Sequence, residues 1–409
     1  MTLPLCRLCG EELSHTFVDL GSSPPCESYR TAEQLDEPEV FYPLHVRICS
    51  HCLLVQLPAY VDAADIFGDY AYFSSFADTW VEHARRFVDE MATVLHLGPD
   101  SLITEVASND GYLLRHAVAR GIPVLGVEPA ANIADVAREH GVRTHVAFLG
   151  GESGHDLAEQ YGRADLVVGN NVFAHTPHLL DFARGLRALV KDTGLVSLEF
   201  PHLLRLIEQR QYDTIYHEHY SYFTLRTASA ALRAAGLTVV DVVELPTHGG
   251  SLRVLSQPSE HAAAPAPRVA AVLAEEATAG LHTLAGHAGF ETAVREVKRD
   301  LLRLLVDASD KGLSVAGYGA PGKGNTLLNH CGIRSDLLPY TVDRSPYKQG
   351  LFLPGTHIPI HAPQRLRETR PDLVLILPWN LREEIVRSLS DVRTWGGRFA
   401  VPIPRATVL

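Results

Sequence analysis

Two histidines and a glutamate lie within a short aromatic segment of this chain. His217, Glu218 and His219 fall inside the twelve residues 212–223. Histidine suits proton abstraction near neutral pH, and a nearby carboxylate can orient its ring. Metal binding by the two histidines is disfavoured, because residues two apart on a helix do not face each other. We expect proton transfer here, and the alternative is a polar loop with a hydrogen-bonded structural histidine.

Four of the six cysteines form two C-x-x-C pairs. The pairs are Cys6 with Cys9 and Cys49 with Cys52. Four thiolates complete the tetrahedral shell of a structural zinc ion, whereas a catalytic zinc keeps an open position. A redox role would need a thioredoxin-like context, and a reducing compartment disfavours disulfides. The sequence therefore predicts a structural zinc site, and Cys26 and Cys331 are expected to be buried or idle thiols.

A polar turn between two expected strands indicates a nucleoside site. The strand at 102–106 runs into the turn at 108–111, and the strand at 123–127 is followed by Glu128. Ligands bind outside the carboxyl ends of such strands, where an acid can hold ribose hydroxyls. The turn lacks the G-x-G-x-x-G that a dinucleotide pyrophosphate requires. S-adenosylmethionine (SAM), a nucleoside without a phosphate, fits better, and the alternative is an ordinary strand–helix unit.

Polar residues also follow a neighbouring strand of the same expected sheet. Asn170, Asn171 and His175 come after the strand at 165–169. The carboxyl ends of parallel strands share one edge of a sheet, where ligand-binding residues gather. A lone histidine is more often structural. Because His175 lies at this edge of the sheet, a structural role and a functional role are both open.

A second glycine-rich turn lies in the C-terminal part of the chain. G-x-G-x-x-G occupies residues 317–322, and Asp343 ends the next strand about twenty residues later. That arrangement suits a dinucleotide, but the turn and Lys323 could instead hold the diphosphate of a nucleotide-linked substrate. The structural alternative is tight packing of a strand on a helix. Further donors beside the acid are Arg344, Tyr347 and Lys348.

The order of expected elements predicts an α/β fold. Strands and helices alternate from residue 101 to about 255, the pattern of a parallel sheet covered on both faces. A stretch rich in Ala, Pro and Ser at 256–267 precedes a helix, whose apolar residues recur at helical spacing. The expected domains are a zinc module at 1–65, a Rossmann-like domain at 66–256, and linker helices with a second Rossmann-like domain at 257–409. Further strands are expected at 196–200, 239–243, 252–256, 313–317, 340–342 and 373–377.

The composition is that of a globular protein. Hydrophobic residues make up 46% and charged residues 21% of the 409 positions, which gives no sign of disorder. The net charge of −12 argues against nonspecific nucleic-acid binding. The first residues do not resemble a signal peptide, and no apolar run approaches about 20 residues. We therefore expect a soluble, cytoplasmic protein with no membrane partner, either a monomer or a homodimer.

Together these motifs resemble those of the three-domain nucleotide-sugar C-methyltransferases of deoxysugar pathways. They occur in order along nearly the whole chain, which makes the match more specific than any single motif. The motifs are the two C-x-x-C pairs, EVASNDG at 105–111, NNVFAH at 170–175, YDTIYHEHYSYF at 212–223, HGG at 248–250, GYGAPGKGNTLLN at 317–329 and DRSPYKQGLFLPGTHIPI at 343–360.

The resemblance implies an N-terminal zinc module, a central class I SAM methyltransferase domain and a C-terminal Rossmann-like domain. It also implies methyl transfer to C3 of a dTDP-4-keto-deoxysugar, with His219 as the base and Tyr216 and Glu218 beside it. The cofactors are then SAM and structural zinc. We expect cofactor contacts from Tyr72, Ser75, Ala107, Asn109, Gly111, Glu128, Pro129, Asn171 and His175. We expect substrate contacts from His175, Tyr222, Tyr318, Lys323, Tyr347 and Lys348.

The expected chemistry begins with the loss of the C3 proton to His219, because the 4-keto group acidifies it. Tyr216, Tyr222 or His175 would stabilise the oxyanion of the resulting enolate. Two alternatives are open. A nucleotide-sugar epimerase would use the same enolate, but the turn and Glu128 argue for SAM. A non-enzymatic nucleotide-sugar-binding protein would have no use for the Tyr-His-Glu-His cluster.

Overall fold

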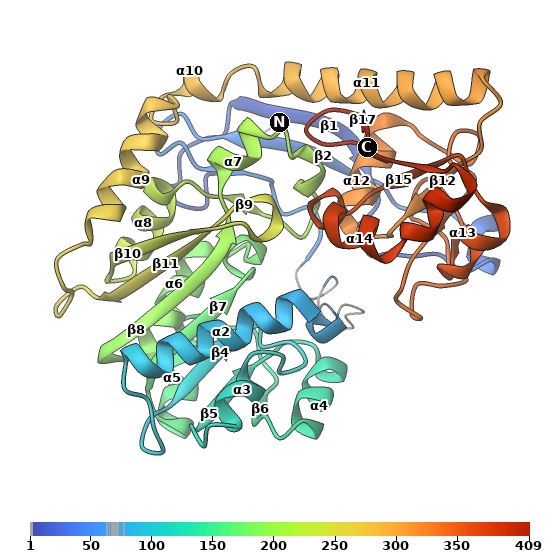
Figure 1. The fold of residues 1–409 in the computed structure, drawn as a ribbon. Coiled ribbons are helices and arrows are strands. Elements are labelled where there is room, and N and C mark those ends of the chain that lie inside the picture. Colours follow the sequence, from blue (N-terminus) through green and yellow to red (C-terminus); the bar gives the residue numbers. More distant parts are fainter. Residues whose placement is uncertain (1–2, 63, 65, 67–72, 77) are drawn as a thin grey trace. The chain divides into compact units, whose positions relative to one another are not determined.

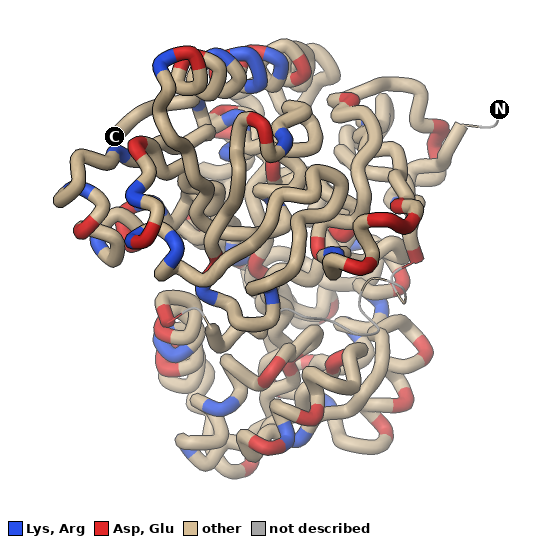
Figure 2. Tube along the Cα trace, turned by 90° about the vertical axis from the view of Figure 1, so that its right-hand side faces the viewer, with Lys and Arg blue, Asp and Glu red and all other residues tan. Residues whose placement is uncertain are grey.

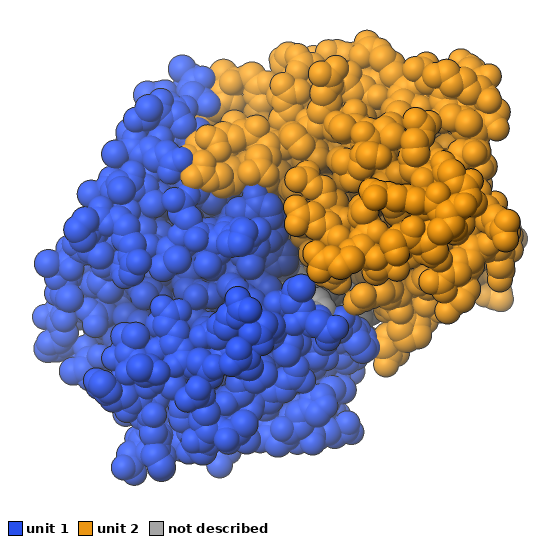
Figure 3. Space-filling view, viewed as in Figure 1, with its two compact units in different colours: residues 1–15, 48–203, 220–286 blue, residues 16–47, 204–219, 287–409 orange. Residues whose placement is uncertain are grey.

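A computed structural model describes residues 3–62, 64, 66, 73–76 and 78–409 (Figure 1). The described chain divides into two compact units, which Figure 3 shows in different colours. Unit 1 comprises residues 1–15, 48–203 and 220–286, and unit 2 comprises residues 16–47, 204–219 and 287–409. The chain passes between the units several times, so each unit is built from three separate segments.

Unit 1 contains a mixed sheet, which within the described residues has seven strands in the order β10-β11-β8-β7-β4-β5-β6. Strands β4 to β8 are parallel to one another where they pair, whereas β11 is antiparallel to both β8 and β10. The expectation of an all-parallel sheet was therefore wrong at β11. Only residues 246–250 connect β10 to β11, and a parallel pair needs a crossover of about a dozen residues. The strands are β4 (Ile103–Val106), β5 (Val124–Val127), β6 (Thr144–His145), β7 (Ala164–Asn170), β8 (Val190–Pro201), β10 (Leu237–Leu245) and β11 (Ser251–Pro258).

Helices cover both faces of this sheet, as the sequence predicts. Successive residues of β7 point to opposite faces: Leu166 and Val168 join one buried cluster, and Val167 joins the other. One face packs against α2 (Asp78–Val94), α3 (Leu114–Val118) and α4 (Ala131–Glu139). The other packs against α5 (Gly151–Tyr161), α6 (Leu179–Leu189), α8 (Leu225–Ala234) and α9 (Pro267–Thr278). The helix that follows β4, α3, begins at Leu114, because Tyr112 and Leu113 still belong to the turn after β4.

The N-terminal part of the chain contributes the strands β1, β2 and β3. In unit 1, β3 (Val55–Gln56) pairs antiparallel with β9 (Ser221–Tyr222). Unit 2 contains β1 (His15–Ser23), apart from its first residue, and most of β2 (Tyr42–Ile48). The strand β9 comes two residues after His219, so the expected base is close in sequence to a strand that pairs with the zinc-module segment.

Unit 2 is a second α/β unit, whose described part has a six-stranded sheet in the order β14-β13-β12-β15-β16-β17. All neighbouring strands are parallel except β16 and β17. The strands are β12 (Val315–Tyr318), β13 (Thr341–Val342), β14 (Ile360–His361), β15 (Leu373–Ile376), β16 (Arg398–Val401) and β17 (Thr407–Val408). The helices include α7 (Leu203–Glu208) apart from its first residue, α11 (Phe290–Asp310), α12 (Gly322–Cys331), α13 (Gln364–Thr369) and α14 (Arg382–Ser388).

The long helix α11 confirms the apolar spacing read from the sequence. Val294, Val297, Leu301 and Leu305 are buried, and Leu304 is half-buried. Acidic and basic residues are mixed along the sequence of α11, and Figure 2 shows the positions of such residues along the Cα trace. No helix in the described part of the chain is long and apolar enough to cross a membrane.

We predict that the crossing of α5 and α6 tolerates no side chain at Gly154. A Cβ there would lie 2.8 Å from the Cα of Gly185. Gly154→Ala should lower the free energy of unfolding by about 1–3 kcal/mol, because a packed interface must move apart. Urea unfolding measures the change. Gly98→Ala is the control, since a Cβ at Gly98 meets nothing within 4 Å; a Gly154→Ala protein as stable as this control would contradict the prediction.

Candidate active site

The cysteines of the two C-x-x-C pairs lie together in unit 1. Their Sγ atoms are all within 4.8 Å of one another, and the Cys6–Cys52 and Cys9–Cys49 Sγ pairs are 3.5 Å apart. A tetrahedral zinc ion with Zn–S bonds of about 2.3 Å requires sulfurs about 3.8 Å apart. Gln56 Nε2 also donates a hydrogen bond of 3.1 Å to Cys6 Sγ, which suits a thiolate. The donor set therefore fits a structural zinc ion with four protein ligands.

The turn after β4 has an unusual backbone. Ala107, Asn109 and Gly111 have φ values of 55°, 49° and 77°. A Cβ on Gly111 would lie 2.9 Å from Val142 Cγ2, so both conformation and space favour glycine there. Ala107 adopts the same left-handed region without being glycine. Non-glycine residues in this region cost about 1–3 kcal/mol and cluster at ligand sites.

Glu128 ends β5 and closes this turn. Its Oε2 accepts a hydrogen bond of 2.9 Å from Asn109 N–H, and its Oε1 accepts one of 3.0 Å from Ala130 N–H. Burial raises the pKa of Glu128, and the two backbone donors oppose that rise. Each carboxylate oxygen has a second lone pair. The side chain can therefore shape the turn and still accept hydrogen bonds from ribose hydroxyls, and Pro129 follows it directly.

The segment before α2 also reaches the turn. Ser74 N–H donates to Asn109 Oδ1 at 2.8 Å, and Ser75 N–H donates to Asp110 Oδ2 at 3.1 Å. The structure thus brings Ser75 to the turn beside Asn109 and Gly111. Tyr72, the remaining expected cofactor residue of this segment, lies outside the described residues.

His248 lies near Asn171, at the edge of the unit 1 sheet where its parallel strands end, and the sequence did not indicate it as a site residue. Its Nε2 lies 3.0 Å from Asn171 Nδ2, and its ring lies edge-on to Trp80 with centroids 5.1 Å apart. Both His248 and Asn171 have left-handed backbones, with φ of 54° and 53°. Burial, with a smaller effect of His248, lowers the pKa of His175 to about 4. His175 is therefore a neutral imidazole at pH 7. The HGG motif alone gave no signal for this contact, because a left-handed histidine cannot be read from sequence.

A buried acid holds the loop that carries His248. Glu199 Oε1 accepts a hydrogen bond of 2.8 Å from Thr247 Oγ1. Its Oε2 lies 2.8 Å from His83 Nε2 and 2.9 Å from Arg253 Nη2. Burial opposes ionisation of Glu199, but His83 and Arg253 outweigh it and lower the pKa. An ionised acid therefore fixes this loop from inside unit 1.

In unit 2, the expected base has a defined ring orientation. His219 Nδ1 lies 2.7 Å from the Thr214 carbonyl oxygen. A carbonyl only accepts, so Nδ1 carries the hydrogen, and in the neutral ring Nε2 carries the lone pair. The Tyr216 ring lies against the imidazole, with centroids 4.1 Å apart. Glu218 is buried, and its Oε1 accepts a hydrogen bond of 3.4 Å from Cys26 Sγ.

The residues around Thr214 are anchored to the second α/β unit. Asp213 Oδ2 accepts a hydrogen bond of 2.6 Å from Trp379 Nε1. The Ile215 carbonyl accepts one of 2.9 Å from Thr326 Oγ1. Burial raises the pKa of Asp213 to about 6. These contacts fix the carbonyl that orients His219.

The second glycine turn is closed in the same way as the first. Asp343 Oδ2 accepts a hydrogen bond of 2.7 Å from Ala320 N–H, and Oδ1 accepts one of 2.8 Å from Ser345 N–H. Each α/β unit thus has an acid, after its second strand, that binds the turn after its first strand. Tyr318 precedes the turn and is buried, whereas Tyr347 is exposed.

The two lysines expected to contact the substrate have protein partners. Lys323 Nζ donates to Asn380 Oδ1 at 2.9 Å and lies 5.1 Å from the centre of the Trp379 ring. Lys348 Nζ donates to the Ala320 carbonyl at 3.0 Å and lies 3.2 Å from Glu27 Oε2. Both ammonium groups therefore stabilise the turn region itself.

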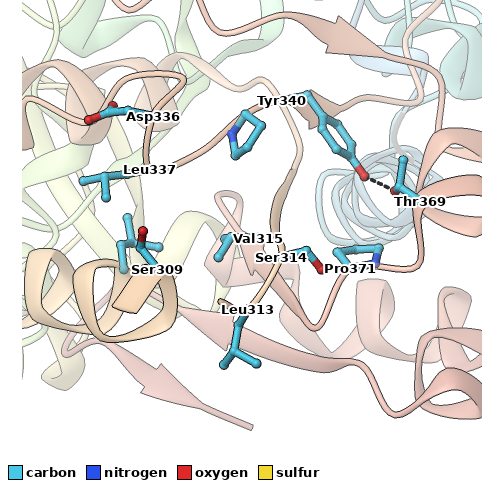
Figure 4. Close-up of a pocket in the computed structure, with 11 residues that line it drawn as sticks. Ser309, Leu313, Ser314, Val315, Asp336, Leu337, Tyr340, Thr369 and Pro371 are labelled. Carbon is cyan, nitrogen blue, oxygen red and sulfur yellow. Dashed lines mark hydrogen bonds between the residues drawn. The ribbon is translucent and has the colours of Figure 1, made fainter. Parts of the chain in front are cut away.

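A hollow of about 180 Å³ lies elsewhere in unit 2, between α11 and the starts of β12, β13 and β15 (Figure 4). Leu313 and Ser314 precede β12, Tyr340 precedes β13, and Pro371 lies just before β15. The hollow is therefore at the amino ends of these strands, opposite the edge where α/β sheets bind ligands.

Known proteins match the whole length of this chain. A zinc binding domain model matches residues 6–67, a methyltransferase domain model matches residues 80–242, and a C-methyltransferase C-terminal domain model matches residues 246–404. The C-methyltransferase NovU of Streptomyces niveus is 36% identical over 404 residues, covering 99% of this chain and 96% of NovU. The chain therefore belongs to the family of SAM-dependent, zinc-binding C-methyltransferases, and it is an enzyme of that class.

Solved structures overlap with less than half of the chain. A SAM-dependent methyltransferase from Clostridium acetobutylicum ATCC 824 has 12% identity and a TM-score of 0.35, covering 43% of this chain and 91% of that one. Magnesium protoporphyrin IX methyltransferase from Synechocystis PCC 6803, with bound SAM, has 16% identity and a TM-score of 0.33, covering 46% of this chain and 86% of that one.

We predict that the zinc site stabilises the fold and takes no part in the chemical step. Cys6→Ser should lose zinc and lower the melting temperature by at least about 5 °C, since about 1 kcal/mol corresponds to about 2–4 °C in domains of this size. Metal analysis and calorimetry measure both effects. Cys331→Ser, outside the cysteine cluster, should keep the zinc. A Cys6→Ser protein that melts like the parent yet is inactive would contradict the prediction.

We also predict that SAM binds at the first turn and not at the second. Glu128→Ala should weaken SAM at least about tenfold, because a hydrogen bond to a charged group contributes about 1.5–3 kcal/mol. Asp343→Ala is the matched control, since Asp343 closes the second turn with the same geometry; it should leave SAM affinity within about twofold of the parent. Isothermal titration measures both, and the reverse pattern would place SAM in unit 2.

Proposed function

We propose that this enzyme methylates C3 of a dTDP-4-keto-deoxysugar, with His219 as the base that removes the C3 proton. The observation that carries the proposal is the hydrogen bond from His219 Nδ1 to the Thr214 carbonyl. It leaves the Nε2 lone pair as the proton acceptor of the neutral ring. A base held in one tautomer by a second hydrogen bond is the arrangement expected of general-base catalysis.

The proton and the electron pair have defined destinations in this mechanism. The C3–H proton moves to His219 Nε2, and the electron pair of the C–H bond forms an enolate with the 4-keto group. When bound, SAM would supply the electrophilic methyl group: a new C–C bond would form to the enolate carbon as the S–CH3 bond breaks, which leaves S-adenosylhomocysteine. His219 then returns its proton to solvent. General-base help of this kind contributes roughly 10²–10⁴-fold to the rate.

Neutral donors would stabilise the enolate oxygen. His175 is neutral at pH 7, because its pKa is about 4. A neutral imidazole keeps one N–H donor, so it can bind an oxyanion without competing for the substrate proton. Tyr216 and Tyr222 are the other proposed donors. Such preorganised donors usually make the largest electrostatic contribution to catalysis.

A backbone hydrogen bond within unit 1 supports the pairing of this base with a SAM domain. Tyr220 N–H donates to the Ala174 carbonyl at 2.8 Å. Ala174 precedes His175 in the segment that follows β7, and Tyr220 follows His219. The residue next to the proposed base is thus fixed at the edge of the sheet where class I methyltransferases bind SAM.

The second glycine turn is the proposed site of the nucleotide. Asp343 closes the turn and keeps lone pairs for ribose hydroxyls. Lys348 and Lys323 lie beside the turn, and an incoming diphosphate would compete with Glu27 for Lys348. Burial lowers the pKa of Lys323, and a diphosphate would oppose that shift. Tyr318 and Tyr347 are the proposed aromatic contacts.

The substrate is tested by incubating the purified protein with SAM and a panel of dTDP-4-keto and reduced dTDP sugars. Mass spectrometry should show a gain of one CH2 unit in a 4-keto sugar only, and NMR should place the methyl on C3. Isomerised product without a methyl gain would favour an epimerase. Methylation of a reduced sugar, or of C5, would contradict the proposal.

We predict that His219→Ala lowers turnover at least about a hundredfold, the low end for a lost general base, while SAM affinity stays near the parent value. His217→Ala is the control, because His217 lies edge-on to Tyr42, with centroids 5.9 Å apart; we expect a smaller loss. Turnover of His219→Ala equal to the parent would remove this residue from its role.

A further inference from the structure

Tyr220, the residue after the proposed base, is held by the zinc-module segment of unit 1. Its carbonyl accepts a hydrogen bond of 3.0 Å from Leu57 N–H. Its hydroxyl donates one of 3.0 Å to the Val61 carbonyl. The side chain is fully buried. Together with the Ala174 contact, these bonds fix both the backbone and the ring of Tyr220.

Arg7 adds a guanidinium to the same backbone. It lies inside the first C-x-x-C, between Cys6 and Cys9. Its Nη1 donates to the Tyr220 carbonyl and, at 3.2 Å, to Ser221 Oγ. Its Nη2 donates to the Leu57 carbonyl at 2.7 Å. The guanidinium also lies 5.6 Å from the centre of the Tyr220 ring. One side chain therefore joins the zinc knuckle to the two residues after His219.

The zinc ligands in turn fix Arg7. Its backbone N–H donates to Gln56 Oε1 at 3.0 Å, while Gln56 Nε2 donates to Cys6 Sγ at 3.1 Å. Gln56 is also the strand partner of Ser221. A sulfur bound to zinc would hold Gln56 and Arg7 in one geometry. The planar guanidinium is suited to this role, because its donors form a rigid fork and little freedom is lost for each bond.

We propose that Arg7 is a positioning residue for the methyl-transfer reaction, and this inference rests on the proposed role of His219. The zinc knuckle positions the Arg7 guanidinium so that it donates a hydrogen bond to the Tyr220 carbonyl. The Tyr220 backbone is thereby fixed, and it restrains His219, the preceding residue. The fully ligated zinc then contributes rigidity to the base without contacting substrate. Small displacements of a catalytic group lower rates strongly, since near-attack geometry is lost.

The test compares three variants of the zinc-loaded full chain. Arg7→Met keeps the apolar stem and removes the guanidinium. Arg7→Lys keeps the charge but loses the fork. Leu8→Ala is the matched control, because Leu8 belongs to the same knuckle and packs on the hydrophobic core of unit 1. The measurements are zinc content, SAM affinity, amide hydrogen exchange at residues 220–222, and turnover of dTDP-4-keto-6-deoxyglucose with SAM.

We expect Arg7→Met to raise hydrogen exchange at 220–222 at least about tenfold and to lower kcat at least about tenfold, with SAM affinity and zinc content unchanged. Arg7→Lys should fall between Arg7→Met and the parent in hydrogen exchange and in kcat. If Arg7→Met loses zinc, Arg7→Lys serves as the test variant in its place. Leu8→Ala should keep parental exchange at these residues. Parental exchange in the Arg7 variants, or raised exchange with parental kcat, would overturn the inference.

His219→Ala distinguishes this inference from the function on which it rests. If His219→Ala keeps parental turnover, the proposed base is wrong, whatever the Arg7 variants do. If His219→Ala loses turnover while Arg7→Met and Arg7→Lys keep parental kcat, only the positioning role of Arg7 is wrong.

Discussion

A hydrogen bond of 2.7 Å between His219 Nδ1 and the Thr214 carbonyl decides which ring nitrogen can accept a proton. The bond places the hydrogen on Nδ1, so that in the neutral ring the lone pair lies on Nε2. The bond depends on elements far apart in sequence. Trp379 donates a hydrogen bond to Asp213, and Thr326 donates one to the Ile215 carbonyl. The second α/β unit therefore fixes the segment that carries the Thr214 carbonyl, and this carbonyl orients the proposed base. This gives the C-terminal domain a structural part in the proposed chemistry, in addition to any contact with the nucleotide.

Both α/β units use an acid to shape a turn. Glu128 and Asp343 each accept one bond from the turn after the first strand and one from the backbone two residues ahead. The turn sequences differ, EVASNDG in one unit and GYGAPGKG in the other. The shared geometry shows that the acid is part of the turn structure before any ribose binds. Each carboxylate oxygen also has a second lone pair, which the proposed hydrogen bonds to ribose hydroxyls would use.

The features that the sequence predicts well are local ones. Strand positions follow from apolar runs, and the four cysteines indicate their own cluster, because two C-x-x-C pairs supply the four thiolates of a structural zinc site. Features that depend on tertiary contacts were missed. The direction of β11 depends on a short connection, Lys323 and Lys348 have protein partners that sequence cannot show, and the left-handed backbone of His248 has no sequence signal. The link from Arg7 to Tyr220 spans more than two hundred residues, so no local pattern could indicate it.

The role of His219 as a base is tested most directly by proton exchange without methyl transfer. The protein is incubated in D2O with a dTDP-4-keto-deoxysugar and S-adenosylhomocysteine, which has no methyl to give, and NMR follows the C3 signal. The mechanism predicts that the parent replaces the C3 proton with deuterium and that His219→Ala does so no faster than the buffer. Undiminished exchange in His219→Ala, or exchange at a carbon other than C3 in the parent, would contradict it.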